Sequence, residues 1–193
     1  MLSEKVRDWT QGLRSAVARV LGGWGVSPNT LTLLGYVLHL PAMYMLATGR
    51  LRAGGALFVV ASAFDALDGS VAREMGQAST FGAFLDSVMD RFSESTVLFG
   101  LLLHYLNGGA GLEPALIYVA MCGSLLVSYT RARAEGVGIT CKEGLFTRFE
   151  RVILLAAGLI LGFTRLALWA LAILTVFTAL QRIYYVWRKT SGE

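Results

Sequence analysis

The sequence predicts an all-α integral membrane protein, with six transmembrane helices preceded by an N-terminal amphipathic helix beside the membrane. Hydrophobic residues make up 55% of the chain and charged residues only 16%, with a mean hydropathy of +0.58, a more apolar balance than soluble domains have. Apolar stretches of membrane-crossing length recur along the chain. Lys and Arg gather where alternate stretches end. At 193 residues, we expect one domain spanning residues 1–193.

The six predicted spans cover most of residues 28–190, which we expect to form a six-helix bundle. They are residues 31–48, 54–72, 80–106, 114–129, 152–163 and 166–187. The fifth is short for a membrane crossing, so we expect its helix to extend back toward Thr147.

Residues 1–25 precede the bundle and show a helical pattern of another kind. Charges interrupt every apolar run, which excludes a signal peptide. Apolar side chains recur every three or four residues, with arginines off that stripe, as in a helix lying on a membrane surface. Packing of this helix against the bundle's own cytoplasmic face is a compatible alternative. The stripe consists of Leu2, Val6, Trp9, Leu13, Val17 and Val20.

The distribution of Lys and Arg predicts the orientation of the bundle. Of the 17 basic residues, only Arg50, Arg52 and Arg165 lie on one side of the predicted membrane, and Arg91 falls within the third span. The remaining thirteen lie on the other side, which the positive-inside rule assigns to the cytoplasm. We therefore expect a multi-pass protein of the cell membrane with both termini in the cytoplasm.

Four aspartates lie within the predicted second and third spans. Asp65 and Asp68 share one helix face by their i, i+3 spacing, and Asp86 and Asp90 share another by i, i+4 spacing. The connection between these spans is short, so the spans should be antiparallel neighbours whose carboxylates face each other. Ionised carboxylates at membrane depth require compensation. Hard oxygen ligands of this number suit Mg²⁺ or Mn²⁺, and four could hold two ions.

Glycines and an arginine accompany the aspartates. Gly69 follows Asp68, and Gly82 lies one turn before Asp86, where a ligand could approach the backbone closely. Arg73 lies about one turn beyond Gly69 and could bind a phosphate. Taken alone, the glycines would more often indicate close packing of membrane helices.

A second polar segment joins the fourth and fifth spans. Four arginines converge there from the cytoplasmic ends of the two helices, more than topology alone requires. Such a cluster is suited to a doubly charged phosphate, through bidentate guanidinium contacts. The four are Arg131, Arg133, Arg148 and Arg151.

The aspartate segment resembles the signature of the CDP-alcohol phosphatidyltransferase family. Its pattern is D-x-x-D-G-x-x-A-R, eight residues, then G-x-x-x-D-x-x-x-D, and every fixed position is present between Asp65 and Asp90. The resemblance implies displacement at the β-phosphate of CDP-diacylglycerol by an acceptor hydroxyl, with release of CMP. By position it implies that Asp65, Asp68, Asp86 and Asp90 bind two metal ions and that Asp90 is also the general base.

The same resemblance implies a site for the CDP-lipid and a subunit arrangement. Similar proteins form homodimers, so we expect one here, and no nucleic-acid partner. Glu94 continues the face of Asp86 and Asp90, where it could orient a ligand, pair with an arginine or contact a second subunit. The residues implied to hold the CDP-lipid are Asn29, Thr30, Leu31, Thr32, Gly69, Arg73 and Ser79.

The arginine segment resembles the phosphatidylinositol phosphate synthase branch of the family. That branch shows S-Y-x-x-A-R-A-E followed by R-P-E-R, and Phe149 here stands where proline is usual. The resemblance implies inositol 1-phosphate as the acceptor, in phospholipid biosynthesis. Glycerol 3-phosphate, the acceptor of phosphatidylglycerol phosphate synthase, is the alternative. The implied acceptor-phosphate site consists of Ser128, Arg131, Arg133, Arg148 and Arg151.

A cation transporter is a more distant alternative, because intramembrane acids can line an ion pathway. That function predicts charges throughout the membrane depth. The acids instead cluster toward the cytoplasmic half, which favours an enzyme at the membrane edge.

Overall fold

The computed structural model describes residues 27–74, 79–109, 111–141 and 143–191, with only the backbone described for residues 66–74. These ranges form six α-helices, and no strand occurs within them. The predicted interfacial helix over residues 1–25 lies outside the described residues. The helices are α2 (Pro28–Ala47), α3 (Leu51–Glu74), α4 (Thr80–Asn107), α5 (Glu113–Gly136), α6 (Arg148–Leu161) and α7 (Thr164–Thr190).

Local sequence signals set several helix ends. The hydroxyl groups of Ser27 and Ser79 accept hydrogen bonds from backbone N–H groups in the first turns of α2 and α4, the usual role of serine at an N-cap. Thr147 and Glu150 form a reciprocal capping box at the start of α6. As expected from the sequence, the fifth predicted span extends back to Thr147. Gly162, in a left-handed conformation with φ of 85°, ends α6.

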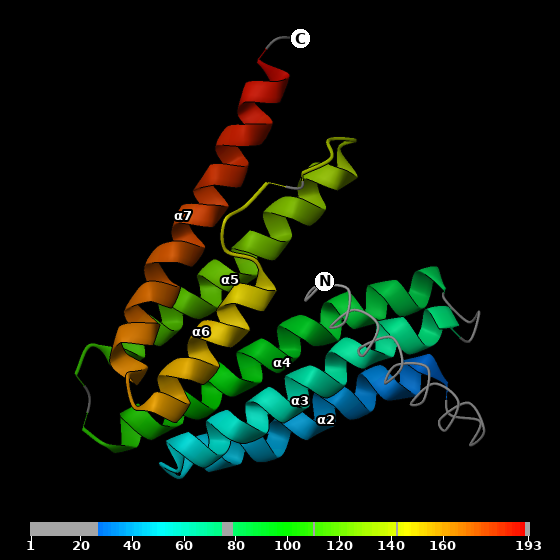
Figure 1. Ribbon diagram of the computed structural model, residues 1–193. Coiled ribbons are helices and arrows are strands. Elements are labelled where there is room, and N and C mark those ends of the chain that lie inside the picture. The colour runs from blue at the N-terminus through cyan, green and yellow to red at the C-terminus, as the bar shows by residue number, and fades with distance from the viewer. Residues whose placement is uncertain (1–26, 75–78, 110, 142, 192–193) are drawn as a thin grey trace, which may run out of the picture.

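The helices form two groups that meet at one end of the molecule and diverge toward the other (Figure 1). In the first group α2 packs against both α3 and α4, and in the second α5 packs along α7. α6 contacts α3 on one side and α7 on the other. α3 and α4 touch each other only sparsely, so the expected close pairing of these helices is replaced by contacts through α2.

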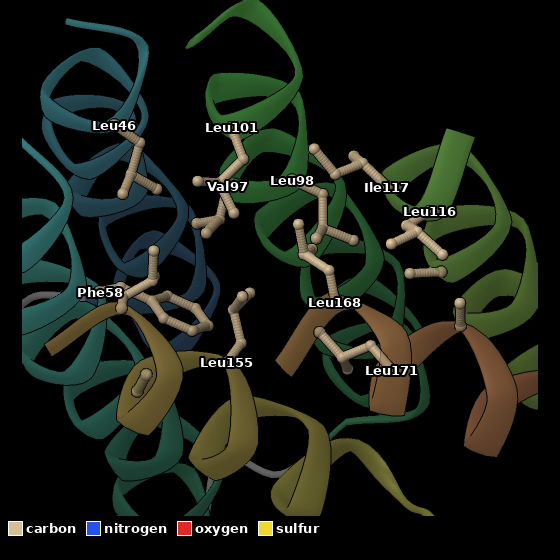
Figure 2. Close-up of a cluster of buried hydrophobic side chains, with 14 of the residues drawn as sticks. Leu46, Phe58, Val97, Leu98, Leu101, Leu116, Ile117, Leu155, Leu168 and Leu171 are labelled. Carbon is tan, nitrogen blue, oxygen red and sulfur yellow. The ribbon is translucent and has the colours of Figure 1, made fainter. Parts of the chain in front are cut away.

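The hydrophobic core lies where the two groups meet. All six helices contribute to it, and the side chains labelled in Figure 2 point toward one another from α2 through α7. Phe58 from α3, Leu98 and Leu101 from α4, and Leu168 and Leu171 from α7 are nearly fully buried. These positions are near the end of α4 and the beginnings of α3 and α7. The core is therefore at the end of the bundle away from the aspartate segment.

Three of the described helices, α2, α5 and α7, are long and apolar enough to cross a membrane. α6 has only 14 residues, and α3 and α4 carry the acidic residues discussed above. Large hydrophobic side chains are exposed on the outside of the bundle, among them Leu33, Phe99 and Phe177. The described part of the chain is therefore helical, with three helices whose length and composition are those of membrane spans.

Candidate active site

Arg148 joins two of the predicted metal-binding aspartates. It is the first residue of α6, and its Nη2 donates to Oδ2 of Asp65 on α3. Its Nη1 lies 2.6 Å from Oδ1 of Asp90 on α4. Asp65 is only 2% exposed, whereas the Arg148 side chain keeps 28% of its surface open. One guanidinium thus brings together carboxylates from two helices that hardly touch.

Gly35 of α2 makes room for the Asp65 carboxylate. A Cβ atom at Gly35 would lie 2.8 Å from Oδ1 of Asp65, closer than side chains tolerate. The carbonyl oxygen of Gly35 accepts a hydrogen bond from Nδ1 of the fully buried His39, at 2.9 Å. Sequence reasoning missed Gly35 because the carboxylate that requires it is 30 positions away and on another helix.

A second ion pair joins α6 to α4, about one helical turn beyond the contact of Arg148 with Asp90. Arg151 Nε is 2.6 Å from Oε1 of Glu94, and Arg151 Nη2 is 2.8 Å from Oε2. Arg151 is 2% exposed and Glu94 is 8% exposed. Arg151, which the sequence predicts to bind the acceptor's phosphate, therefore has its guanidinium bound by Glu94, whose role the sequence left open.

The residues predicted to hold the CDP-lipid lie partly together. Asn29 at the start of α2 and Ser79 at the start of α4 both approach Gly82, where a Cβ atom would lie 3.1 Å from Asn29 Oδ1 and from Ser79 Oγ. Thr30 is exposed at the same end of α2. Leu31 and Thr32 are buried, and the Thr32 hydroxyl donates to the Pro28 carbonyl. The α2 and α4 N-termini are thus neighbours, as a shared site requires.

The other predicted residues of this region are less fully described. Asp68, Gly69 and Arg73 lie on α3, beyond the part of the chain whose side chains the structure describes. Asp86 is half-buried on α4, one turn before Asp90.

The predicted acceptor residues of α5 do not join Arg148. Ser128 lines a cavity of about 790 Å³ between α4 and α5, together with Arg91. Arg133 lines a separate cavity of about 200 Å³ between α5 and α7, together with Arg182. Arg131 is exposed and its Nε lies 3.0 Å from the Glu135 carboxylate. Because these side chains leave α5 in different directions, they form no single cluster with α6 among the described contacts.

Arg182 is a structural residue that the sequence did not single out. It is 4% exposed within α7. Its Nε donates to the Glu143 carbonyl at 2.8 Å, and its Nη1 donates to the Val127 carbonyl. A Cβ atom at Gly144, whose φ is 140°, would lie 2.8 Å from this guanidinium. Arg182 thereby holds the connection that leads into α6. An isolated arginine in an apolar helix was the available signal.

The carboxylates fit a divalent cation by their chemistry. Oδ1 of Asp65 is buried and makes no hydrogen bond among the described residues, although buried carboxylate oxygens normally have a partner. Oxygen donors from two helices are suited to Mg²⁺ or Mn²⁺. Among the described side chains no three His, Cys, Asp or Glu residues form a complete metal cluster, and the set predicted from the sequence includes Asp68, whose side chain is not described.

Comparisons with known proteins identify relatives of the whole chain. An archaetidylinositol phosphate synthase of Pyrococcus horikoshii is 34% identical, over 95% of this chain and 95% of its own length. A solved structure of Mycobacterium tuberculosis phosphatidylinositol phosphate synthase with CDP-DAG bound is 31% identical, with a TM-score of 0.84 over 90% of this chain and 93% of that one.

The same Mycobacterium tuberculosis enzyme, in complex with manganese and citrate, has a TM-score of 0.83 at 31% identity, over 90% of this chain and 88% of that one. The family model for CDP-alcohol phosphatidyltransferases matches residues 25–180. These findings confirm the resemblance predicted from the aspartate pattern. The chain belongs to the CDP-alcohol phosphatidyltransferase family.

Proposed function

We propose that this transferase of phospholipid biosynthesis moves the phosphatidyl group of CDP-diacylglycerol to a hydroxyl of inositol 1-phosphate and releases CMP. The relatives named above make inositol phosphate lipids, and one of them binds CDP-DAG. The observation that carries the proposal is the position of Arg148, which bridges Asp65 and Asp90. A guanidinium beside the proposed base is where an acceptor that carries a phosphate would be held.

Asp90 is the proposed general base. An alcohol is a weak nucleophile at neutral pH, so a carboxylate must take its proton as the new phosphorus–oxygen bond forms. The bond that breaks joins the lipid-bearing phosphorus to the oxygen of the departing CMP. Because Arg148 lies 2.6 Å from Asp90, a phosphate bound to Arg148 would bring the acceptor hydroxyls close to this base.

The remaining predicted residues complete the site in this proposal. Asp65, Asp68, Asp86 and Asp90 would hold two Mg²⁺ or Mn²⁺ ions, which neutralise the negative charge of the diphosphate. The neighbouring N-termini of α2 and α4, with Asn29, Thr30, Leu31, Thr32 and Ser79, would bind the cytidine diphosphate together with Gly69 and Arg73. Ser128, Arg131 and Arg133 lie apart from Arg148 in the structure, so Arg148 is the residue on which the proposed acceptor site rests.

The decisive experiment measures CMP release by the purified protein with CDP-diacylglycerol and Mg²⁺ against a panel of acceptors. We expect turnover with inositol 1-phosphate to exceed that with glycerol 3-phosphate, free inositol and serine. A preference for glycerol 3-phosphate would support the phosphate site but would identify a different acceptor. Preference for an unphosphorylated acceptor would contradict the arginine site. Absence of metal-stimulated CMP release with every acceptor would contradict the transferase function.

The proposal includes a membrane arrangement with six spans, in which α3, α4 and α6 cross beside α2, α5 and α7. The C-terminal end of α3 and the N-terminal end of α6, which carries Arg148, would then face the cytoplasm. Both chain termini would also be cytoplasmic, within one domain of residues 1–193. Labelling of single cysteines by a membrane-impermeant maleimide in spheroplasts tests this, in a background without Cys122 and Cys141. Arg165→Cys should be labelled in intact spheroplasts, and Arg188→Cys only after their lysis.

A homodimer is also proposed, on the resemblance to family members that form one. Light scattering of the detergent-solubilised protein, corrected for bound detergent, should give twice the 20.9 kDa mass of the chain. A protein mass of 20.9 kDa across the working concentration range would contradict it.

A further inference from the structure

The Glu94–Arg151 pair is the most deeply buried interaction between charged groups of known geometry in the described part of the chain. The two side chains are joined by two charge-assisted hydrogen bonds of 2.6 and 2.8 Å, the fork geometry that guanidinium and carboxylate favour. Arg151 Nη1 also donates to the Phe146 carbonyl at 3.4 Å. A buried pair gains little net stability, because desolvation offsets most of the attraction. The pair nevertheless fixes the relative position of the two side chains.

That geometry concerns the placement of α6 against α4. Glu94 follows Asp90 by four residues on α4, and Arg151 follows Arg148 by three on α6. The two helices are thus joined by two successive ion pairs. In the inner pair, Glu94–Arg151, both carboxylate oxygens contact the one guanidinium. In the outer pair, Arg148 divides its contacts between Asp90 and Asp65. More contacts between the same two side chains therefore fix the geometry of the inner pair.

The inner pair also holds the segment that enters α6. Phe146, whose carbonyl accepts from Arg151, directly precedes the capping box of Thr147 and Glu150. Arg148 directly follows the N-cap residue Thr147. The position of its guanidinium therefore depends on a backbone segment that two contacts hold: the hydrogen bond from Arg151 to the Phe146 carbonyl, and the capping box.

We propose that Glu94 and Arg151 form a positioning pair that sets the guanidinium of Arg148 for the acceptor's phosphate, and that Arg151 does not itself bind this phosphate. This assignment rests on the proposed function, since it requires Arg148 to bind the phosphate of the acceptor. It separates two arginines that the sequence pattern places in one role. It also gives Glu94 a function.

Glu94→Gln distinguishes positioning from direct phosphate binding. If Arg151 bound the phosphate, loss of the Glu94 charge would release its guanidinium, and the acceptor KM would stay the same or fall. For a positioning pair, the loss displaces Arg148, and misplacement of about 1 Å is costly in an active site. We expect the acceptor KM to rise about tenfold, with the KM for the CDP-lipid changed less than twofold.

The double variant provides the second comparison. Arg151→Gln should raise the acceptor KM as much as Glu94→Gln does, and Glu94→Gln/Arg151→Gln should be no worse than either single variant. Residues that act as one unit show this non-additivity. Independent effects that multiply in the double variant would overturn the proposal.

A reversed pair tests the position of the charges. Glu94→Arg/Arg151→Glu keeps the ion pair but removes the guanidinium from residue 151. Recovery of acceptor KM toward the wild-type value supports positioning, and an acceptor KM that stays at the single-variant level in a protein with wild-type thermal stability overturns it. If the reversed pair does not fold, the comparison of the Gln variants decides.

The matched control is the ion pair at the other end of the bundle. Arg165 Nε lies 3.2 Å from Glu113 Oε1, again between two helices. Arg165→Gln and Glu113→Gln should leave both KM values unchanged, and an equal rise in acceptor KM in these variants would reduce the Glu94 result to a general packing effect and overturn the assignment.

Calorimetric binding of inositol 1-phosphate gives a readout without turnover. The wild-type protein should bind it, and Glu94→Gln should weaken binding about tenfold. Absence of binding by the wild type would defeat the acceptor site of the proposed function. Wild-type binding that Glu94→Gln does not weaken would defeat only the positioning pair.

Discussion

The two ends of the helical bundle are built on opposite principles. At one end all six helices converge on side chains such as Phe58, Leu98 and Leu168, with no ion pair among them. At the other end the two helix groups diverge (Figure 1), and α6 is joined to α3 and α4 by arginine–carboxylate pairs. One end is held mainly by close packing, with the Arg165–Glu113 pair beside it, and the other by ion pairs that reach the bundle interior.

This difference separates stability from chemistry. Apolar packing is dense and tolerates little change of volume, so we expect most of the stability of the fold to come from the converging end. The diverging end can then keep partly exposed charged groups, which a bilayer-embedded protein otherwise tolerates poorly. Substitutions at the charged end should therefore alter activity more than stability, and those at the packed end the reverse.

The largest expected effect is the loss of a carboxylate that is proposed to bind metal. Asp65→Ala or Asp86→Ala should abolish CMP release while the protein remains folded, because the oxygen ligands on which the reaction depends are removed. Excess EDTA should abolish activity of the wild type, and added Mg²⁺ should restore it. The measurement is CMP release beside a melting curve. Turnover that persists in metal-free buffer would contradict the metal requirement.

A smaller loss is expected when only the base is removed. Asp90→Asn keeps an oxygen that can bind a cation but cannot accept the acceptor's proton. General-base loss typically lowers the rate by about 10²–10⁴, and the change should appear in kcat. Near-normal kcat in this variant would remove Asp90 from the role of base.

Substitution of Arg148 should affect the acceptor selectively. A bidentate charged contact is worth roughly 1.5–3 kcal/mol, so Arg148→Gln should raise the acceptor KM about tenfold to a hundredfold. Arg148→Lys should also be impaired, since an ammonium group cannot reproduce the fork. Steady-state kinetics with each substrate varied in turn measures this. An equal rise in the KM of the CDP-lipid would argue against an acceptor-specific role.

The smallest effect on activity is expected at the packed end. A Cβ atom at Gly158 of α6 would lie 2.4 Å from Cβ of Ala167 on α7, so Gly158→Ala should force the helices apart and destabilise the fold by about 1–3 kcal/mol. The melting temperature should fall while kcat below the transition stays within about twofold. Gly136→Ala is the matched control, because nothing lies within 4 Å of the added atom. A loss of kcat without loss of stability in Gly158→Ala would contradict the division between the two ends.

The sequence predicted much of this architecture for physical reasons that can be identified. The helices follow from long apolar runs, and the family follows from aspartates at fixed helical spacing. Periodicity places Asp65 and Asp90 on helix faces, but it does not say which helices pack together. The sparse contact between α3 and α4 therefore required the structure, as did the close approach of Gly35 to Asp65.

The partners of the arginines were also beyond sequence reasoning. Arg148 and Arg151 are three residues apart, a spacing that suits one shared role. Only the fold places a carboxylate of α4 opposite each, and it leaves Arg148 partly open while burying Arg151. Ser128 and Arg133, five residues apart on α5, line different cavities for a related reason. Two residues that are five positions apart on a helix do not share one face.

The ion pairs of α6 have a consequence for how the chain is assembled during synthesis. The partner of Asp65 is made 83 residues later, and the partner of Glu94 is made 57 residues later. In a chain that enters the membrane as it leaves the ribosome, α3 and α4 would thus arrive with carboxylates whose arginines do not yet exist. An uncompensated acid disfavours insertion, so these helices should depend on α2, or on the translocation machinery, until α6 arrives. Truncation before residue 148 should leave them poorly inserted, although every residue of the aspartate pattern would be present.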